Sequence, residues 1–159
     1  MTLQLPFLPW EYFKPNPTKR FLSLMNSPGV LNPANIDQIF QDLKPIKPDN
    51  LIGEWDGFIL PTGHPFEDDL EDLNWFGNTF DSMDDVAPLM VAKNGERVRF
   101  EEWGGASLCE IRYHGVVSAA LIYDERPVKV HYRAVRSDMV ACIMESKRFE
   151  QKVYFYLTK

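Results

Sequence analysis

The sequence predicts a mainly β protein, an antiparallel β-barrel with two short N-terminal helices. Three observations support this fold class. From residue 51 onward, apolar and polar residues alternate with a period of two, as in strands that have one buried face. Short turn signals separate the apolar runs, and the pair Asn94 and Gly95 is the strongest of them. A long antiparallel meander usually closes into a barrel, because closure removes its exposed edges.

The two helices are predicted before residue 50. Pro15 and Pro17 precede a first helix over residues 17–26, and an Asn-Pro pair precedes a second helix over residues 33–43. A capping residue next to a proline is a helix-start signal. Apolar residues recur at spacings of three and four in the second helix, at Ile36, Ile39, Phe40 and Leu43. We expect this apolar face to pack against the strands that follow.

The strands are predicted from the period-two runs. They cover residues 51–60, 74–80, 88–93, 97–103, 107–114, 116–123, 128–135, 138–145 and 152–158. Only residues 65–72 read as a short helix among them. The acidic residues of this segment lack the alternating oxygen ligands of a calcium loop. A solvated helix face with favourable charges in its first turn explains them better.

Composition predicts one soluble domain over residues 1–159. The chain is 45% hydrophobic and 25% charged, and no apolar run approaches the roughly 20 residues of a membrane span. Its net charge of -6 argues against a nucleic-acid partner. Prolines near the start would interrupt a signal peptide. Cys109 and Cys142 have no metal-ligand spacing, so we expect free thiols in a cytoplasmic protein, for which a homodimer is a possible assembly.

The motif GEWDG sets Trp55 between Gly53 and Gly57 on one face of the first strand. Glycines on both sides would let the indole lie along the strand, or let another backbone approach, and would let the strand coil. We therefore assign the two glycines a structural role. Trp55 is either a core residue of the barrel or part of the wall of a ligand cavity.

These residues also carry a resemblance to a known family. The stretch from Leu51 to Met90, which includes GEWDG, resembles the GXWXG domain, and the stretch GVVSAALIYDERPVKVHYRAV resembles the DUF4334 domain that accompanies it. The similar regions are residues 19–93 and residues 97–158, which together would form one barrel. The resemblance implies a calycin-like β-barrel with N-terminal helices and leaves the activity open. Val130 stands where the family often has an acid, and Cys142 where it often has a glycine.

The segment YDERPVKVHYRAV is the richest in chemically active residues. One face of its strand carries Val128, Val130 and Tyr132, whereas the other carries Lys129, His131 and Arg133. If the apolar face points inward, the cations are ordinary surface residues. If the polar face lines the barrel, His131 and Arg133 could hold a carboxylate or an enolate oxygen, with Asp124 or Tyr123 as the partner at the strand's mouth.

Other candidate residues are more dispersed. His64 lies in the loop LPTGHP, and loops over a barrel mouth commonly carry function, although a turn or helix-entry role is also open. Trp75, Tyr123 and Tyr132 join Trp55 as aromatic residues that could line a pocket. The three histidines show no paired spacing, so no metal site is predicted, and no cofactor fingerprint is present in the sequence.

The leading hypothesis is that the barrel cavity binds a small, mostly apolar molecule with one acidic or carbonyl end. Trp55, Trp75 and Tyr132 would contact it, and His131 or Arg133 would hold its polar end. The alternative is a cofactor-free isomerase or cyclase for an apolar metabolite, in which His131 or His64 moves a proton together with Asp124. A third hypothesis is an interaction module that uses the aromatic leader of residues 5–13 and the N-terminal helices.

Overall fold

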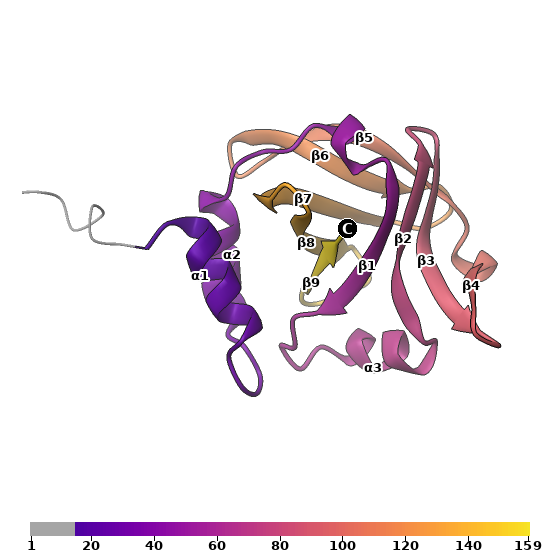
Figure 1. Ribbon diagram of the computed structural model, residues 1–159, viewed down its shortest axis with the longest axis horizontal. Coiled ribbons are helices and arrows are strands. Elements are labelled where there is room, and N and C mark those ends of the chain that lie inside the picture. Colours follow the sequence, from indigo (N-terminus) through magenta and orange to yellow (C-terminus); the bar gives the residue numbers. More distant parts are fainter. Residues whose placement is uncertain (1–14) are drawn as a thin grey trace, which may run out of the picture.

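Eight antiparallel strands close into a barrel in the computed structural model, which describes residues 15–159 (Figure 1). Each strand pairs with the next around the barrel, and the last pairs with the first. Their bounds, in this order, are β1 Gly53–Ile59, β2 Trp75–Ser82, β3 Asp85–Lys93, β5 Ala106–Tyr113, β6 Val116–Tyr123, β7 Val128–Arg136, β8 Met139–Ser146 and β9 Val153–Thr158. The predicted antiparallel barrel is confirmed. The aromatic leader of residues 5–13 lies outside the described residues.

The short strand β4, Glu96–Arg99, lies outside the barrel and pairs only with β3 among the described strands. The turn between them contains Asn94 and Gly95, both with positive φ, as the Asn-Gly signal predicts. The predicted strand over 97–103 is wrong in its second half. Residues Glu101–Trp103 form a 3-10 helix that ends at Gly104, whose φ of 74° turns the chain toward β5.

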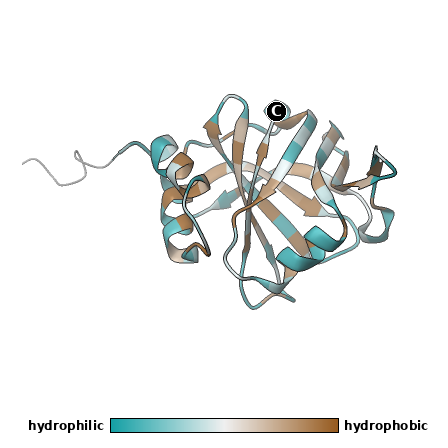
Figure 2. Cartoon of the chain, turned by 60° about the horizontal axis from the view of Figure 1, so that its bottom comes forward, coloured by the Kyte–Doolittle hydropathy of each residue, from teal (hydrophilic) through white to brown (hydrophobic). Residues whose placement is uncertain are grey.

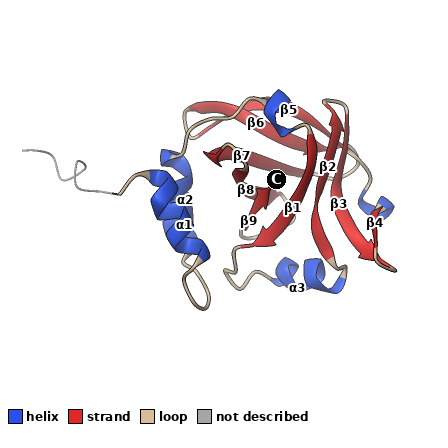
Figure 3. Ribbon diagram, viewed as in Figure 1, coloured by secondary structure: helices blue, strands red, loops and turns tan. Residues whose placement is uncertain are grey.

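Helices α1, Pro17–Met25, and α2, Pro33–Asp42, lie against the outside of the barrel (Figure 3). The side chains of Asn16 and Asn32 accept hydrogen bonds from the first turns, and a proline follows each cap, as predicted. A third helix, α3, Pro65–Asp72, closes one end of the barrel, since its buried residues join the interior core. No helix among residues 15–159 has the length and apolar character needed to cross a membrane.

Two apolar clusters hold the molecule together. The first fills the barrel interior, and the second lies between the two N-terminal helices and the outer faces of β7, β8 and β9. Successive side chains of a strand point to opposite faces of the sheet, so one strand can contribute to both clusters. Figure 2 shows apolar residues in brown along the strands. The apolar face of the second helix, Ile36, Ile39 and Phe40, is buried in the outer cluster, as expected from its spacing.

A seam between β6 and β7 is closed by a different part of the chain. These strands share only three paired positions, from Ala120 with His131 to Ile122 with Lys129. Beyond them, the segment after α2 fills the gap: Lys44 bridges to Ala134, and the carbonyl of Ile46 accepts from the N–H of Ala119. The Ser118 hydroxyl also joins the two sides, since it accepts from the N–H of Ile46 and donates to the carbonyl of Tyr132. The helices are thus attached to the barrel by backbone pairing as well as by side-chain contacts.

Gly53 and Gly57 are required for reasons other than the packing of Trp55 itself. A Cβ atom at Gly57 would overlap the ring of Trp75, and a Cβ at Gly53 would lie 2.6 Å from Nζ of Lys159. Gly53 also has a φ of 130°, which side chains rarely adopt. The structural role predicted for both glycines therefore rests on the Trp75 ring at Gly57 and on the backbone conformation at Gly53, because the flexible Lys159 side chain could move away. The expectation that the cleared space lets the Trp55 indole lie along the strand is corrected.

Candidate functional site

The barrel interior is filled by its own side chains. The apolar face of β7 points inward, and Trp55, Phe80 and Tyr132 retain at most 1% of their surface. The indole N–H of Trp55 donates to the carbonyl of Leu51 at 2.7 Å, and the rings of Phe80 and Tyr132 meet edge to face at 6.0 Å. A ligand-sized cavity would leave accessible surface on the residues that line it. The expectation of a cavity beside Trp55 and Tyr132 is therefore not met.

Trp75 and Tyr123 also lie on the interior side. Trp75 is partly buried and its ring is nearly perpendicular to that of Phe155, at 5.5 Å between ring centroids. Tyr123 is buried and meets Trp103 edge to face at 5.9 Å. Burial raises the pKa of the Tyr123 phenol well above its usual range, so this hydroxyl stays protonated. The predicted aromatic residues thus line the inside of the barrel, where the interior core fills the space.

The polar face of β7 points outward; Lys129 is exposed there, whereas His131 and Arg133 are buried beneath α2 and its neighbours. Arg133 is 1% exposed, and its guanidinium donates to the carbonyls of Gln41 and Leu43 at the end of α2 and of Tyr113 at the end of β5. A cation at a helix C-terminus is favourable because the last carbonyls have no partner within the helix. Neither outcome expected from the sequence is observed, since Arg133 is neither an ordinary surface residue nor a wall of the barrel cavity.

His131 lies two residues earlier on the same outer face and is 3% exposed. Its ring stacks on Tyr113 with a centroid distance of 3.8 Å and an interplanar angle of 9°. Its Nε2 lies 2.9 Å from Oε1 of Glu145 on β8. Burial lowers the pKa of His131 even though Glu145 opposes the shift, so the ring is neutral near pH 7 and Nε2–H donates to the carboxylate.

Glu145 is the centre of this polar cluster. The Lys129 ammonium lies 3.6 Å from the same oxygen, Oε1, that His131 approaches. Burial alone would raise the pKa of Glu145, but the hydrogen bond from His131 and the charges of Lys129 and Lys152 outweigh it, and the net shift is downward. Among residues 15–159, no hydrogen bond reaches Oε2. Glu145 is therefore an ionised carboxylate with one oxygen held and one oxygen available.

Lys152 precedes β9 and extends the cluster toward α2. Its ammonium lies 3.7 Å from Oδ1 of Asp37 and 5.6 Å from the ring centroid of Tyr113. Asp37 also accepts a hydrogen bond of 2.8 Å from the hydroxyl of Tyr154. Burial lowers the pKa of Lys152, but Tyr113, Asp37 and Glu145 together raise it above its ordinary value. The ammonium is therefore charged at neutral pH.

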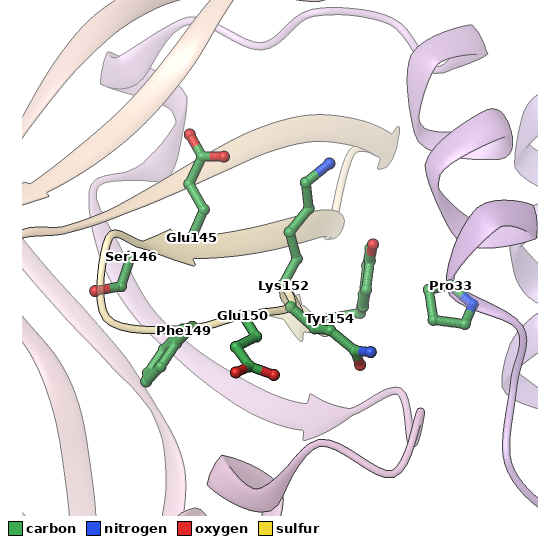
Figure 4. A pocket seen from close by; sticks show the side chains of 8 residues that line it. Pro33, Glu145, Ser146, Phe149, Glu150, Lys152 and Tyr154 are labelled. Atoms are coloured by element: carbon green, nitrogen blue, oxygen red, sulfur yellow. The ribbon is translucent and has the colours of Figure 1, made fainter.

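A pocket of about 430 Å³ opens beside this cluster, between the start of α2 and the hairpin that joins β8 to β9 (Figure 4). It is lined by Pro33, Glu145, Ser146, Phe149, Glu150, Gln151, Lys152 and Tyr154. Figure 4 shows the Glu145 carboxylate and the Lys152 ammonium extending from neighbouring segments toward the same side. Two aromatic rings and three charged side chains, those of Glu145, Glu150 and Lys152, thus line this pocket, which we call the outer pocket.

His64 and Asp124 do not join the outer pocket. His64 caps α3: its Nδ1 accepts from the N–H of Phe66 at 3.0 Å, so Nε2 carries the proton and donates to the carbonyl of Gln151 at 3.1 Å. Asp124 lies exposed at the β6–β7 turn and accepts from the hydroxyl of Ser107 at 3.4 Å. The sequence hypothesis pairs Asp124 with either His131 or His64, but among residues 15–159 each of these residues has other partners.

Several residues of the outer pocket were not predicted from the sequence, among them Glu145 and Lys152. The pairing of β7 with β8 sets Lys129 opposite Glu145, so Glu145 is diagonal to His131. Glu145 could be found from the sequence by pairing the predicted strands 128–135 and 138–145 as a hairpin. Lys152 and Asp37 carry no such signal, because they meet through the packing of α2 on the barrel. Among residues 15–159, no three side chains of metal-binding type converge.

Comparison with known proteins identifies the family. Residues 38–95 match the GXWXG protein family, and residues 104–159 match a domain of unknown function, DUF4334. The crystal structure of a protein from Thermomonospora curvata is similar, with a TM-score of 0.84 and 33% sequence identity over 90% of this chain and 97% of that one. No match was found among curated proteins. The chain therefore belongs to the family in which a GXWXG domain is followed by a DUF4334 domain.

Proposed function

We propose that the protein binds a small, mostly apolar molecule with one carbonyl end in the outer pocket. The observation that carries this proposal is the convergence of a charged Lys152 and an ionised Glu145 on a pocket of about 430 Å³. A pocket of this size falls in the range of small-ligand sites, which combine apolar walls with a few oriented polar groups. The carbonyl oxygen would accept from Lys152, and the apolar body would lie on Phe149 and Tyr154.

The outer pocket is favoured over the barrel interior for a physical reason. A ligand in the interior would have to displace Trp55 or Tyr132 from close packing, and removing a large core side chain from its site costs about 3–5 kcal/mol. The outer pocket needs no such displacement, because its space is already open to solvent. The sequence analysis expects a ligand with an acidic or carbonyl end inside the barrel; the proposal keeps the carbonyl alternative and moves the ligand to the outer wall.

A matched pair of probes tests this proposal. 2-Tetralone has an apolar bicyclic body and one carbonyl, whereas tetralin has the same body without the oxygen. We expect 2-tetralone to shift the amide resonances of residues 149–154 and to bind roughly tenfold more tightly than tetralin, because a hydrogen bond to a charged group is worth about 1.5–3 kcal/mol. Lys152→Met should remove the difference between the probes. Tyr132→Phe, in the interior, should leave both affinities unchanged.

The outcomes distinguish the two locations. Equal affinity for both probes would remove Lys152 from recognition. Shifts centred on the Trp55 indole, with residues 149–154 unaffected, would place the ligand inside the barrel and overturn the proposed site. Native mass spectrometry of the protein purified from its expression host adds an independent check, since a retained small molecule should be lost from the Lys152→Met variant and kept by Tyr132→Phe.

A further inference from the structure

The outer pocket contains the groups that a proton transfer needs, in addition to those that bind a carbonyl. We propose that the protein catalyses enolisation of a bound ketone, in which the free oxygen of Glu145 takes a proton from the carbon next to the carbonyl and Lys152 stabilises the oxygen. This inference rests on the proposed function, because it requires the carbonyl to lie at Lys152. It names enolisable ketones as the substrate class.

Glu145 has the geometry of a general base. Its Oε1 is fixed by His131 at 2.9 Å, while Oε2 has no hydrogen bond among residues 15–159, and the residue lines the pocket. Its lowered pKa keeps it in the ionised, proton-accepting form at neutral pH. A base must lie within hydrogen-bond reach of the proton it removes. Because Glu145 lines the pocket, we expect its available oxygen to come within this reach of a bound ketone.

His131 is a positioning residue that acts through Glu145. Stacking on Tyr113 at 3.8 Å and nearly complete burial fix its ring, so the carboxylate is held in one orientation. His131 donates as a neutral imidazole and therefore holds Glu145 without adding a full positive charge beside it. A fixed carboxylate has little conformational freedom to lose when the reaction begins.

Lys152 supplies the positive charge that the reaction requires. Enolisation moves negative charge onto the carbonyl oxygen, and a preorganised cation stabilises that charge in the transition state. Asp37 lies 3.7 Å from the ammonium and helps to orient it, and the centroid of the Tyr113 ring is 5.6 Å from it. Lys152 retains partial exposure, with 31% of its side-chain surface accessible, so a ligand can reach it.

The step is balanced within the site. The C–H bond breaks and its proton moves to Oε2 of Glu145, the bonding electron pair forms the new C=C bond, and the carbonyl π pair moves onto the oxygen. The resulting enolate is stabilised by hydrogen bonding to the Lys152 ammonium. Return of the proton to the same carbon regenerates the ketone, and return to a conjugated position gives an isomer. Neither route consumes a co-reactant.

Hydrogen–deuterium exchange of 2-tetralone tests the inference. The protein is mixed with 2-tetralone in D₂O, and the loss of the C1–H resonance is followed by ¹H NMR against buffer alone. We expect the wild-type protein to accelerate the exchange and Glu145→Gln to slow it roughly 10²-fold or more, which is the usual contribution of a general base. Asp124→Asn is the matched control, since Asp124 lies at a turn away from the pocket, and its exchange rate should equal that of the wild type.

His131→Gln separates positioning from a merely structural effect. Loss of the imidazole removes an interaction that lowers the pKa of Glu145, so the acid limb of the exchange rate should move to higher pH. A lower rate with an unchanged pH midpoint would overturn the role of His131. Circular dichroism and the amide spectrum confirm that each variant is folded, and Glu145→Asp provides a second variant that keeps the carboxylate.

The failure of this inference can be told apart from that of the proposed function. If 2-tetralone binds at residues 149–154 but exchanges no faster than in buffer, enolisation is overturned and binding stands. If exchange is accelerated equally by Glu145→Gln, Glu145 is not the base and the inference is overturned. If neither 2-tetralone nor tetralin binds the wild-type protein, the proposed function and this inference fail together.

Discussion

Two adjacent residues of β7, His131 and Tyr132, belong to opposite environments although both are buried. Tyr132 faces an interior filled by apolar and aromatic side chains, whereas His131 faces an outer wall covered by α2, where charged groups pair with one another. The difference shows that a covering helix can turn the outside of a barrel into a second buried surface. In this protein the buried polar residues His131 and Arg133 lie on that second surface.

The largest effect should come from the interior. Trp55→Ala removes a side chain that is 1% exposed, and we expect it to lower the free energy of unfolding by about 3–5 kcal/mol, because the surrounding core can collapse only partly. Urea denaturation measures the change. Trp103→Ala, at a partly buried position, should cost less. A loss below about 1 kcal/mol for Trp55→Ala would indicate that the interior is loosely packed, and would contradict the difference drawn between the interior and the outer wall.

The next effect should come from the outer wall. Arg133→Met keeps the length of the side chain but leaves the carbonyls of Gln41, Leu43 and Tyr113 without their donor. We expect a loss of about 2–4 kcal/mol in the free energy of unfolding, since each unsatisfied buried group costs about 1–3 kcal/mol. Arg133→Lys keeps the charge but not the forked geometry, so its free energy of unfolding should lie between those of the wild type and Arg133→Met. Thermal unfolding of all three proteins ranks them, and a neutral Arg133→Met would show that water replaces the guanidinium.

A smaller effect is expected at the end of the barrel. His64→Ala removes the acceptor that caps α3, and we expect a loss of about 1 kcal/mol, the usual value of a helix cap. His64→Asn restores an acceptor at the same position and should recover most of the loss, as judged by chemical denaturation. Equal stability of the two variants would instead assign the effect to the contact between His64 and Phe149.

The smallest effect should be a pH dependence of the free energy of unfolding that is caused by residues of the outer wall and by none of the interior. The pKa of His131 is lowered in the folded protein, so between the unfolded value of about 6.5 and the folded value, the unfolded chain binds a proton that the folded chain does not. The free energy of unfolding therefore falls as the pH drops through this window. The lowered pKa of Glu145 extends the loss to more acidic pH, as the pH falls through the folded value.

Denaturant titrations from pH 8 to pH 4 measure this dependence. His131→Gln should lose the part of the decrease that begins near pH 6.5, whereas Tyr132→Phe, on the interior face, should keep it. An unchanged profile in His131→Gln would mean that another group carries the decrease.

Much of the fold could be predicted from the sequence because the signals are local. The alternation from residue 51 onward, the proline-marked helix starts and the Asn94-Gly95 turn each act over a few residues, and the corresponding elements are present. Alternation alone could not say which face of β7 points inward. It also could not reveal that α2 covers the outer face, because that packing joins residues far apart in the chain.

The candidate site was predictable only in part for the same reason. His131 was selected from its segment, but its partner was expected to be Asp124 or Tyr123 and is Glu145. Strand pairing across one hairpin supplies Glu145, whereas Lys152 and Asp37 come from two other elements. Residues that meet through tertiary packing show no regular spacing in the sequence. Each can therefore be recognised as a candidate, but which candidates lie together is seen only in the fold.

The seam between β6 and β7 has a consequence for the order of folding. It is closed by Ile46 and Ser118, which lie 72 residues apart, so the barrel can be completed only after a long loop has been brought together. Contacts of such separation slow folding, and we expect the seam to form late, after the local hairpins. The amides of Ile46, Ala119 and Ala134, whose hydrogen bonds close the seam, should then gain protection last in a pulse-labelling experiment. In that case the segment after α2 completes the barrel and does not start its folding.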